Sequence, residues 1–490
     1  MEYPSSMSAV VAIGATLVSA AAFFFGGGLS GLWPLMWMAP IPVLLIALRS
    51  SNRMAMAIAF AAYLLGGLNM ARYLTRLAPT IVVVTAVVLP AAVFALAVAV
   101  GRDGFRRLPA WSAAFAFPLL WTSYEFLLSQ TSPHGTASSL AYSQANFLPV
   151  LQLASITGIA GITFLLTLFP STVVVAWMCR GRPEQARIAL ALPVLVAVAA
   201  LGYGVVRLQQ PSLEVTLMAG LAVTDSTIDR FDTSDPAVAL PVIEAYVRRI
   251  DTLAARGARV VVLPEKFVGV TRAYSASVDS LLSGAARRGH VMVVAGLNHL
   301  ETAERHNVAQ VYGDDGRIVV SYEKAYPVPG FEAGYPHGTV PGIFPSAFGL
   351  VGVAICKDMD FPSWLRRYAR AGARIVLVPA WDFGSDGWLH SRMAIVRGVE
   401  GGFAVVRTAQ DGRATMSDDR GRVSVEAASA SAPEVLLTGQ VRIGSGATLY
   451  TRFGDWFGWL SLGLLGVLLT AARRGRRSAD GSVPGPAERV

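Results

Sequence analysis

Three residues that can do chemistry together each follow an apolar, strand-like run. Glu265 follows VVVLP, Lys324 follows IVVSYE, and Cys356 follows VGVAI. A thiol is a nucleophile, and a carboxylate can take up its proton and later return it. An ammonium lowers the pKa of a thiol and stabilises a tetrahedral oxyanion. Because active sites gather beyond the carboxyl ends of strands in α/β sheets, we expect these side chains to meet.

Each of the three residues also has an ordinary structural explanation when taken singly. A Cys at a strand end is usually a buried core residue, a Glu after Leu-Pro usually lies in a solvated turn, and a Lys that ends a strand usually lies at the surface. The joint pattern favours function, because the same position relative to a strand recurs three times.

The composition predicts a protein that lies largely in a membrane. Of the 490 residues, 53% are hydrophobic and only 15% are charged, which is too apolar for an ordinary soluble protein. The net charge of +9 could indicate a nucleic-acid partner, but the arginines cluster beside apolar runs, so we expect none. Eight apolar runs are long enough, or nearly so, for helices that span a bilayer: 7–25, 32–48, 54–74, 79–101, 109–127, 153–178, 188–206 and 456–472.

Arginine clusters predict how the eight runs are oriented. With a cytoplasmic N-terminus, the short outer loops carry only Arg72 and Arg76, as the positive-inside rule expects. The cytoplasmic side then holds Arg49, Arg53, Arg102, Arg106, Arg107, Arg180, Arg182, Arg187, Arg473, Arg474, Arg476 and Arg477. The first run could instead be a signal peptide, but its flank lacks Lys and Arg. The membrane would separate Cys179 from Cys356, so we expect no disulfide between them.

The long stretch between the seventh and eighth runs predicts a soluble α/β domain. Its continuous apolar runs are typical of strands buried on both faces. We expect strands at 213–220, 258–266, 291–297, 317–324, 350–356 and 374–379. A helix at 362–372 would begin with Pro and end with Gly. The expected parts are a seven-span bundle at 1–210, the α/β domain at 211–447, a C-terminal span at 448–478 and a disordered tail at 479–490.

Glu265, Lys324 and Cys356, in this order and these settings, resemble the Glu-Lys-Cys triad of the nitrilase (carbon–nitrogen hydrolase) superfamily. KAYPVPGFE, residues 324–332, resembles the family's lid, in which the triad Lys is followed by Val-Pro and a second Glu, here Glu332. Three later segments resemble the helix, strand and hairpin that follow in the nitrilase superfamily: 388–400, 405–412 and 417–423. The order of a helical bundle, a nitrilase-type domain and one last span resembles the apolipoprotein N-acyltransferase family. The stretch 140–166 of the bundle also resembles that family.

This resemblance implies a four-layer α-β-β-α sandwich and a ping-pong acyl transfer. Cys356 would attack a phospholipid ester, and the resulting acyl thioester would pass to the N-terminal amine of a diacylglyceryl-cysteine lipoprotein. Glu265 would be the general base and acid. Lys324 and the backbone N–H of Lys357 would support the oxyanion, and Glu332 would help to position the site.

The resemblance also implies a setting for the enzyme. We expect a monomer that crosses a bacterial inner membrane several times, with its catalytic domain on the periplasmic side. No cofactor is implied. No metal is expected either, because the six histidines show no paired ligand spacing: His134, His290, His299, His306, His337 and His390.

The residues after Cys356 depart from the family pattern. Lys357 stands where these acyltransferases commonly have an aromatic residue. Its side chain could assist thiolate formation or meet a phosphate head group. Asp358 and Asp360 are expected to pair with Arg366 or Arg367.

Three other functions stay open on the sequence. In a membrane-tethered amidase or hydrolase, the same triad would pass the acyl group to water or to a different acceptor. A catalytically silent domain would bind lipid or a partner protein, but the intact triad argues against it. A transporter is disfavoured because the predicted spans carry almost no charged residues in their centres.

Overall fold

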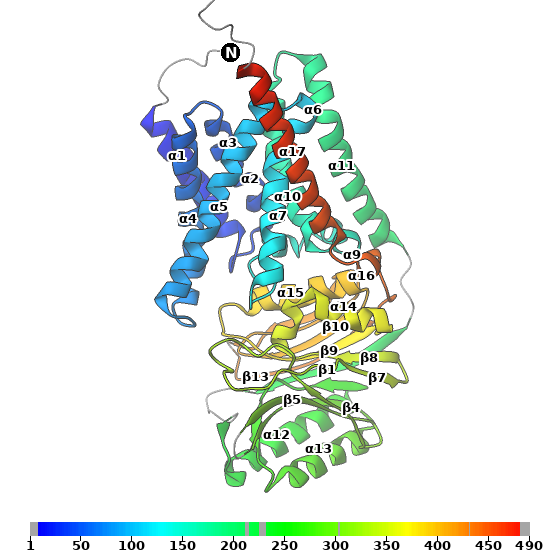
Figure 1. The fold of residues 1–490 in the computed structure, drawn as a ribbon. Coiled ribbons are helices and arrows are strands. Elements are labelled where there is room, and N and C mark those ends of the chain that lie inside the picture. The colour runs from blue at the N-terminus through cyan, green and yellow to red at the C-terminus, as the bar shows by residue number, and fades with distance from the viewer. Residues whose placement is uncertain (1–7, 211–214, 225–231, 302–303, 431, 481–490) are drawn as a thin grey trace, which may run out of the picture.

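An apolar helical bundle lies against one outer face of a layered α/β domain (Figure 1). The computed structural model describes residues 8–210, 215–224, 232–301, 304–430 and 432–480. The expected start of the α/β domain at residue 211 and residues 481–490 of the expected tail lie outside this description.

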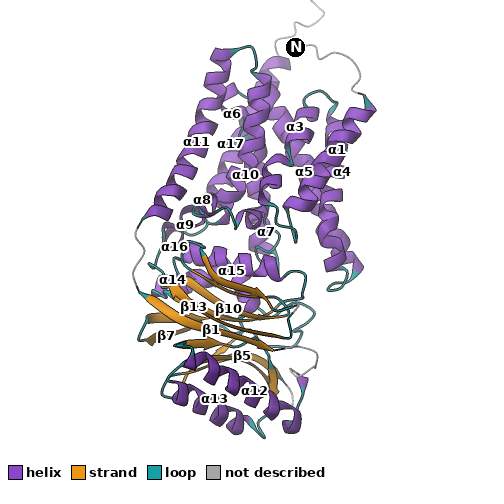
Figure 2. Cartoon of the chain, turned by 180° about the vertical axis from the view of Figure 1, so that it is seen from behind, coloured by secondary structure: helices purple, strands orange, loops and turns teal. Residues whose placement is uncertain are grey.

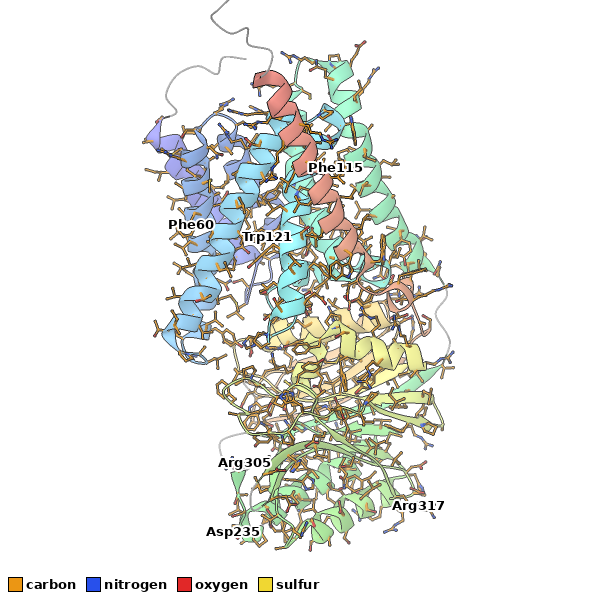
Figure 3. All side chains as sticks on the ribbon, viewed as in Figure 1. Phe60, Phe115, Trp121, Asp235, Arg305 and Arg317 are labelled. Atoms are coloured by element: carbon orange, nitrogen blue, oxygen red, sulfur yellow. The ribbon has the colours of Figure 1, made fainter. Side chains whose placement is uncertain are left out.

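The bundle is built from helices at both ends of the chain. Its elements are α1 (Ala9–Gly26), α2 (Trp33–Met38), α3 (Ile41–Ala47), α4 (Asn52–Leu74), α5 (Thr80–Arg107), α6 (Ala110–Ala113), α7 (Ala116–Thr131), η1 (Leu140–Gln144), α8 (Leu148–Leu151), α9 (Ala154–Thr157), α10 (Ile159–Met178), α11 (Pro183–Gln209), α16 (Leu449–Phe453) and α17 (Trp456–Asp480). Phe60, Phe115 and Trp121 lie among these helices, whereas Asp235, Arg305 and Arg317 lie at the far end of the α/β domain (Figure 3).

Six helices in the described part of the chain are long and apolar enough to cross a membrane, not the eight that the sequence predicts. They are α1, α4, α5, α10, α11 and α17. The expected spans at 32–48 and 109–127 are each divided into two shorter helices, α2 with α3 and α6 with α7. Pro40 separates the first pair and Pro118 lies in the first turn of α7. Since proline has no backbone N–H to donate to the preceding turn, each interrupts the helical hydrogen bonding.

The α/β domain contains two sheets. In the first, the strand order is β13-β1-β2-β4-β5-β6, and β3 pairs with β4; in the second, the order is β12-β11-β10-β9-β8-β7. The strands of the first sheet are β1 (Thr216–Thr224), β2 (Val260–Val262), β3 (Val268–Val270), β4 (Met292–Leu300), β5 (Arg305–Tyr312), β6 (Ile318–Glu323) and β13 (Glu434–Arg442). Those of the second are β7 (Gly342–Ser346), β8 (Gly349–Val353), β9 (Ile375–Trp381), β10 (Ala404–Gln410), β11 (Arg413–Ser417) and β12 (Val423–Ala428).

The order of layers in this domain is helix, sheet, sheet, helix (Figures 1 and 2). Helices α12 (Pro236–Ala255) and α13 (Ser275–Gly289) cover the first sheet on the side away from the bundle. Helices α14 (Pro362–Ala371) and α15 (Gly387–Gly401) lie between the second sheet and the bundle. The central strands β1, β2 and β4 are parallel, as are β8, β9 and β10, and their apolar runs are buried on both faces, as expected for sheets covered on both sides.

The bundle and the α/β domain share a buried apolar cluster centred on α15. Leu389, Met393, Ile395 and Val396 of this helix pack in one cluster with residues of η1, α8, α9 and α10. Burial of such a continuous apolar surface stabilises the interface by the hydrophobic effect. The second sheet is therefore held close to the membrane bundle through α15.

Arginines of the hairpin between β11 and β12 bind the end of α11. Arg420 donates to the carbonyls of Arg207 and Gln210, and Arg422 donates to the carbonyl of Leu208. The last carbonyls of a helix have no partner inside the helix and carry a partial negative charge. The two guanidinium groups therefore join the last long helix before the α/β domain to that domain.

We predict that Arg420→Met destabilises the protein by about 2 to 3 kcal/mol, because charge-assisted hydrogen bonds to the end of α11 are lost. The measurement is the midpoint of thermal unfolding of the full chain in detergent. Arg317→Met is the matched control, since the side chain of Arg317 is 88% exposed. Equal midpoints for the two variants would show that these contacts do not stabilise the protein.

Candidate active site

Glu265, Lys324 and Cys356, which the sequence predicts to meet, lie together in the core of the α/β domain. The Lys324 Nζ is 2.7 Å from Glu265 Oε1, and the Cys356 thiol lies within electrostatic reach of both groups. All three side chains are buried. Glu265 follows β2 and Lys324 follows β6 of the first sheet, whereas Cys356 follows β8 of the second, so the site is built from both sheets.

Glu332, the second predicted carboxylate, completes the surroundings of the ammonium. Its Oε2 is 2.8 Å from Lys324 Nζ. Lys266 Nζ lies 2.6 Å from the other oxygen of Glu332. Two ammonium groups and two carboxylates therefore alternate in one buried cluster, and their charges balance, as burial of charged groups requires.

The two carboxylates differ in how many hydrogen bonds they accept. Glu332 Oε2 accepts from Lys324 and from a backbone N–H, and its Oε1 accepts from Lys266 and from the amide of Asn307. Glu265 uses only Oε1, which accepts from Lys324 at 2.7 Å and from Asn307 at 2.6 Å. Among the described residues, none donates a hydrogen bond to Glu265 Oε2. This oxygen is therefore the one that is free to take up a proton.

Cys356 sits at the start of a tight turn, η3 (Cys356–Asp360). Its φ of 39° lies in the left-handed region, which residues with a Cβ rarely adopt. Backbone strain of this kind persists only where the surrounding structure imposes it, and it clusters at functional sites. The thiol is 3.3 Å from the carbonyl oxygen of Trp381, so its direction is set by the turn and by the end of β9.

Electrostatics keep the thiol and the ammonium protonated. Burial, together with the charge of Glu265, raises the pKa of the Cys356 thiol well above its ordinary value, although Lys324 acts in the opposite direction. Burial by itself would lower the pKa of Lys324, but Glu265 and Glu332 raise it well above its ordinary value. A protonated thiol needs a neighbouring base when it attacks, and Glu265 is the carboxylate with a free oxygen.

Asp358 joins the turn of Cys356 to the segment after Lys324. Its carboxylate accepts from the backbone N–H groups of Ile355, Ala325 and Tyr326 at 2.8, 3.1 and 2.9 Å, and from the hydroxyl of Tyr322 at 2.8 Å. The sequence expectation that it pairs with an arginine is wrong. A carboxylate buried with four donors satisfies three backbone groups that would otherwise lack partners.

Asp360 does not pair with an arginine either. It lies 3.3 Å from the Nζ of Lys357, while Arg366 pairs with Asp455 at 3.1 Å and Arg367 donates to a backbone carbonyl. Both carboxylates of the turn are buried, whereas Arg366 lies against Tyr450 of α16 and Arg367 lies at the carbonyl of Thr339.

Sequence analysis missed three residues that the fold brings to this site. Lys266 donates to Glu332, and Asn307 donates to both Glu265 and Glu332. His134, in the loop between α7 and η1, places its Nδ1 3.3 Å from the Nζ of Lys357. Lys266 could have been suspected, because it follows Glu265 directly. Nothing in the pattern around Asn307 or His134 predicts their positions.

An ion pair at the start of α15 is hydrogen-bonded to α4. His390 Nε2 is 3.0 Å from Asp386, whose carboxylate also accepts from the hydroxyl of Tyr73 at the end of α4. Burial alone would lower the pKa of His390, but Asp386, with Asp360 and Asp382 nearby, raises it to about 9. The imidazolium is therefore the stable form at neutral pH.

Two family models match the chain in succession. A model described as the apolipoprotein N-acyltransferase N-terminal domain matches residues 14–172, and a carbon-nitrogen hydrolase model matches residues 208–445. The apolipoprotein N-acyltransferase of Geobacter metallireducens is 28% identical over an alignment 498 positions long, which covers 92% of this chain and 92% of that protein.

Two amidases match part of the chain. A deaminated glutathione amidase of Synechocystis is 27% identical over 191 residues, covering 33% of this chain and 69% of the amidase. The crystal structure of an amidase from Nesterenkonia matches with a TM-score of 0.41 and 19% identity, covering 50% of this chain and 95% of that one.

We predict that Gly296→Ala disturbs the position of Glu265. A Cβ at residue 296 would lie 2.3 Å from the carbonyl oxygen of Pro264 and 2.6 Å from the Cα of Glu265, so the backbone that carries the carboxylate must shift. Misplacing a catalytic group by about 1 Å can cost roughly 100-fold in rate. The measurement is the rate of acylation of Cys356 by p-nitrophenyl palmitate, and a rate like that of the parent would refute the prediction.

Gly284→Ala is the matched control for this experiment. Residue 284 lies within α13, and a Cβ there would contact only the flexible end of the Arg288 side chain at 3.2 Å. We expect this variant to acylate at the parent rate.

The pair of His390 and Asp386 predicts a dependence of stability on pH. Because the folded-state pKa of about 9 exceeds the ordinary value of about 6.5, the stabilisation is complete below about pH 6.5 and is lost as the pH rises through 9. The loss is on the order of 3 kcal/mol. Thermal midpoints should therefore fall between pH 6.5 and 9 in the parent and fall less in His390→Gln. An equal fall of the thermal midpoint with pH in both proteins would show that the pair of His390 and Asp386 does not cause this dependence.

Proposed function

Because this chain belongs to the apolipoprotein N-acyltransferase family, we propose that it transfers an acyl chain from a phospholipid to the N-terminal amine of a diacylglyceryl-cysteine lipoprotein. A thioester on Cys356 carries the acyl group between the two substrates. The observation that supports this most directly is the placement of a thiol beside a buried ammonium and a carboxylate with one free oxygen.

In the first half-reaction, the sulfur of Cys356 attacks the ester carbonyl of the phospholipid. Glu265 takes the thiol proton on its free oxygen as the C–S bond forms. The ammonium of Lys324 and the backbone N–H of Lys357 stabilise the oxyanion. Collapse of the tetrahedral intermediate breaks the C–O bond, and Glu265 returns its proton to the departing oxygen of the lysophospholipid.

In the second half-reaction, the amine of the lipoprotein attacks the thioester. Glu265 takes a proton from the attacking nitrogen, and the same two donors stabilise the second oxyanion. The C–S bond breaks, the amide product leaves, and the proton returns from Glu265 to the sulfur of Cys356. Glu332 holds Lys324 in place throughout, because its four hydrogen bonds occupy both of its oxygens.

The proposed setting is a bacterial inner membrane, with a monomer whose catalytic domain, residues 211–447, faces the periplasm. Residues 1–210 and 448–478 would lie in or at the membrane. The divided helix α2–α3 still carries the chain across the bundle, since Trp33 contacts Gln144 near the α/β domain and Ala47 contacts Arg102 at the other end. This supports the predicted alternation of arginine-rich and arginine-poor loops. Both substrates carry acyl chains that can stay in the lipid while their head groups reach the site.

A membrane-tethered amidase or hydrolase is the alternative. The observation in its favour is that a third of the chain is similar to a deaminated glutathione amidase. The match of residues 14–172 to the acyltransferase N-terminal model favours the transferase.

The experiment is mass spectrometry of the purified protein after incubation with phosphatidylethanolamine. We expect an acyl adduct on Cys356, released by a diacylglyceryl-cysteine peptide as an N-acylated product. Cys356→Ala should form no adduct, and Cys179→Ala, which removes the other thiol, should form it normally. Discharge by water alone would favour the hydrolase, and a folded protein that forms no adduct would exclude phospholipid as the donor.

A further inference from the structure

The chain uses lysine at only three positions, and all three lie at the candidate active site. Of its 41 Lys and Arg residues, only Lys266, Lys324 and Lys357 are lysines. Lys266 and Lys324 bind Glu332, and Lys357 directly follows Cys356. A lysine ammonium is a compact point charge, whereas an arginine guanidinium is a planar fork that binds both oxygens of a carboxylate. Because arginine supplies the other strongly basic side chains, these three positions indicate a need for the smaller ammonium.

The backbone of Lys266, whose side chain the proposed reaction does not use, is held between the two sheets. Its φ of 46° lies in the left-handed region, which residues with a Cβ rarely adopt. The N–H of Glu265 donates to the carbonyl of Ala380 in β9 at 3.2 Å, and the N–H of Phe267 donates to the carbonyl of Gly296 in β4 at 3.0 Å. Strain of this kind persists only where the surrounding structure imposes it. The fold therefore fixes the place from which the Lys266 side chain reaches into the site.

The contacts of this side chain suit an ammonium better than a guanidinium. The Lys266 Nζ is 2.6 Å from Glu332 Oε1 and 5.2 Å from the centre of the Tyr335 ring. The other oxygen of Glu332 already accepts from Lys324 at 2.8 Å and from the backbone N–H of Val328 at 2.7 Å. A guanidinium that bound both oxygens would compete with Lys324, whereas an ammonium on Oε1 leaves Lys324 in place.

Lys266 also makes the buried cluster neutral. Lys266 and Lys324 carry one positive charge each, and Glu265 and Glu332 carry one negative charge each. The side chain of Lys266 is only 12% exposed, so solvent screens its charge weakly. Burial by itself would raise the pKa of Glu332, but Lys324 and Lys266 hold it well below its ordinary value. Without Lys266, one ammonium would face two carboxylates, and binding of one proton would restore neutrality.

The hydrogen bonds indicate where that extra proton would bind. With Lys266 removed, Glu332 Oε1 would still accept from Asn307, at 2.7 Å, and its Oε2 would still accept from Lys324. Glu265 Oε2 accepts from no residue that the structure describes. An oxygen to which nothing donates can carry a proton without giving up a hydrogen bond. The extra proton would therefore occupy the oxygen that takes the thiol proton in the proposed mechanism.

Other ionisable groups face the same cluster. Asp382 and Arg407 form a buried ion pair, and their charges act on the thiol of Cys356 in opposite directions. Burial raises the pKa of Asp358 to about 6, while the charge of Lys324 acts in the opposite direction. A substitution at residue 266 leaves these groups in place. Differences between variants at that residue therefore report on Lys266 itself.

We propose that Lys266 is a positioning residue of the acyl transfer: through Glu332, its ammonium keeps the buried cluster neutral without an added proton, so that Glu265 Oε2 is open to the thiol proton at neutral pH. This inference rests on the proposed function. Lys266 contacts no reacting atom in this role. It determines the lower pH limit of the reaction rather than the maximal rate.

The test is the pH dependence of Cys356 acylation by p-nitrophenyl palmitate, with the full-length protein in detergent micelles. Released p-nitrophenol is measured after all samples are brought to one alkaline pH, and Cys356→Ala provides the blank. We expect the parent rate to rise with pH to a plateau. In Lys266→Met, the rising limb should lie higher by about 1 pH unit or more, because an opposite charge beside the carboxylates is lost. The rate on that limb then falls about tenfold, while the plateau changes by less than about threefold.

Two further substitutions of Lys266 separate its charge from its hydrogen bond and its shape. Lys266→Gln keeps an N–H donor but loses the charge, so its limb should shift as in Lys266→Met. Lys266→Arg keeps the charge, so its limb should stay at the parental pH, with a lower plateau because the fork competes with Lys324. Arg272→Met is the matched control, since it removes an exposed cation from the turn before α13, and it should behave like the parent.

Thermal midpoints measured in parallel show whether each variant is folded. If Lys266→Met is not folded, Lys266→Gln tests the same loss of charge. Failure of both neutral variants to fold would place the need for the charge in the fold itself and would overturn the inference.

The remaining outcomes separate this inference from the proposed function. A loss by the same factor at every pH in the two neutral variants would show that Lys266 only supports the structure around Glu332. A limb that shifts as far in Lys266→Arg as in Lys266→Met would show that the charge is not responsible. Either result overturns the inference and leaves acylation of Cys356 in the parent standing, whereas absence of acylation in the parent would overturn the proposed function itself.

Discussion

The buried ammonium of Lys324 is the constraint on which the rest of the α/β domain depends. An ammonium removed from water is tolerated only when it is paired, and removal of one partner of a buried ion pair costs about 3 to 5 kcal/mol. Glu265 and Glu332 provide the pairing, and Lys266 balances the second carboxylate. The strands β2 and β6 must therefore keep a fixed separation, which β4 and β5 between them provide.

The same charges define how the thiol of Cys356 can react. The low-polarity core disfavours a thiolate, and Glu265 adds a repulsive negative charge, so the resting thiol keeps its proton. Lys324 favours negative charge at the site, which matters most when an oxyanion forms. In the proposed mechanism, the single free carboxylate oxygen of Glu265 couples proton removal to attack. The two carboxylates differ in the number of hydrogen bonds they accept, and this difference is the reason for proposing Glu265 as the base and Glu332 as the supporting group.

The membrane bundle takes part in the architecture of the site. Thr136 binds the end of the nucleophile turn, Tyr73 binds the carboxylate that pairs with His390, and α15 packs among the short helices of the bundle. Arg420 and Arg422 bind the end of α11. Since these contacts come from several parts of the bundle, the turn that carries Cys356 is oriented with respect to the helical bundle as well as to the two sheets.

The sequence by itself determined the membrane character, the α/β layering and the positions of the three reactive residues at strand ends, because hydrophobic periodicity and strand termini are local properties of the chain. It overestimated the number of continuous spanning helices among the described residues, since Pro40 and Pro118 divide helices whose composition alone looks continuous. It predicted that Asp358 and Asp360 pair with arginines. In the structure, Asp358 accepts hydrogen bonds from backbone N–H groups and Asp360 pairs with Lys357. The tertiary structure alone decided that Asn307 would bridge the carboxylates and that His134 would meet Lys357, because these contacts join residues far apart in the chain, and no local pattern specifies which distant donor fills a buried position.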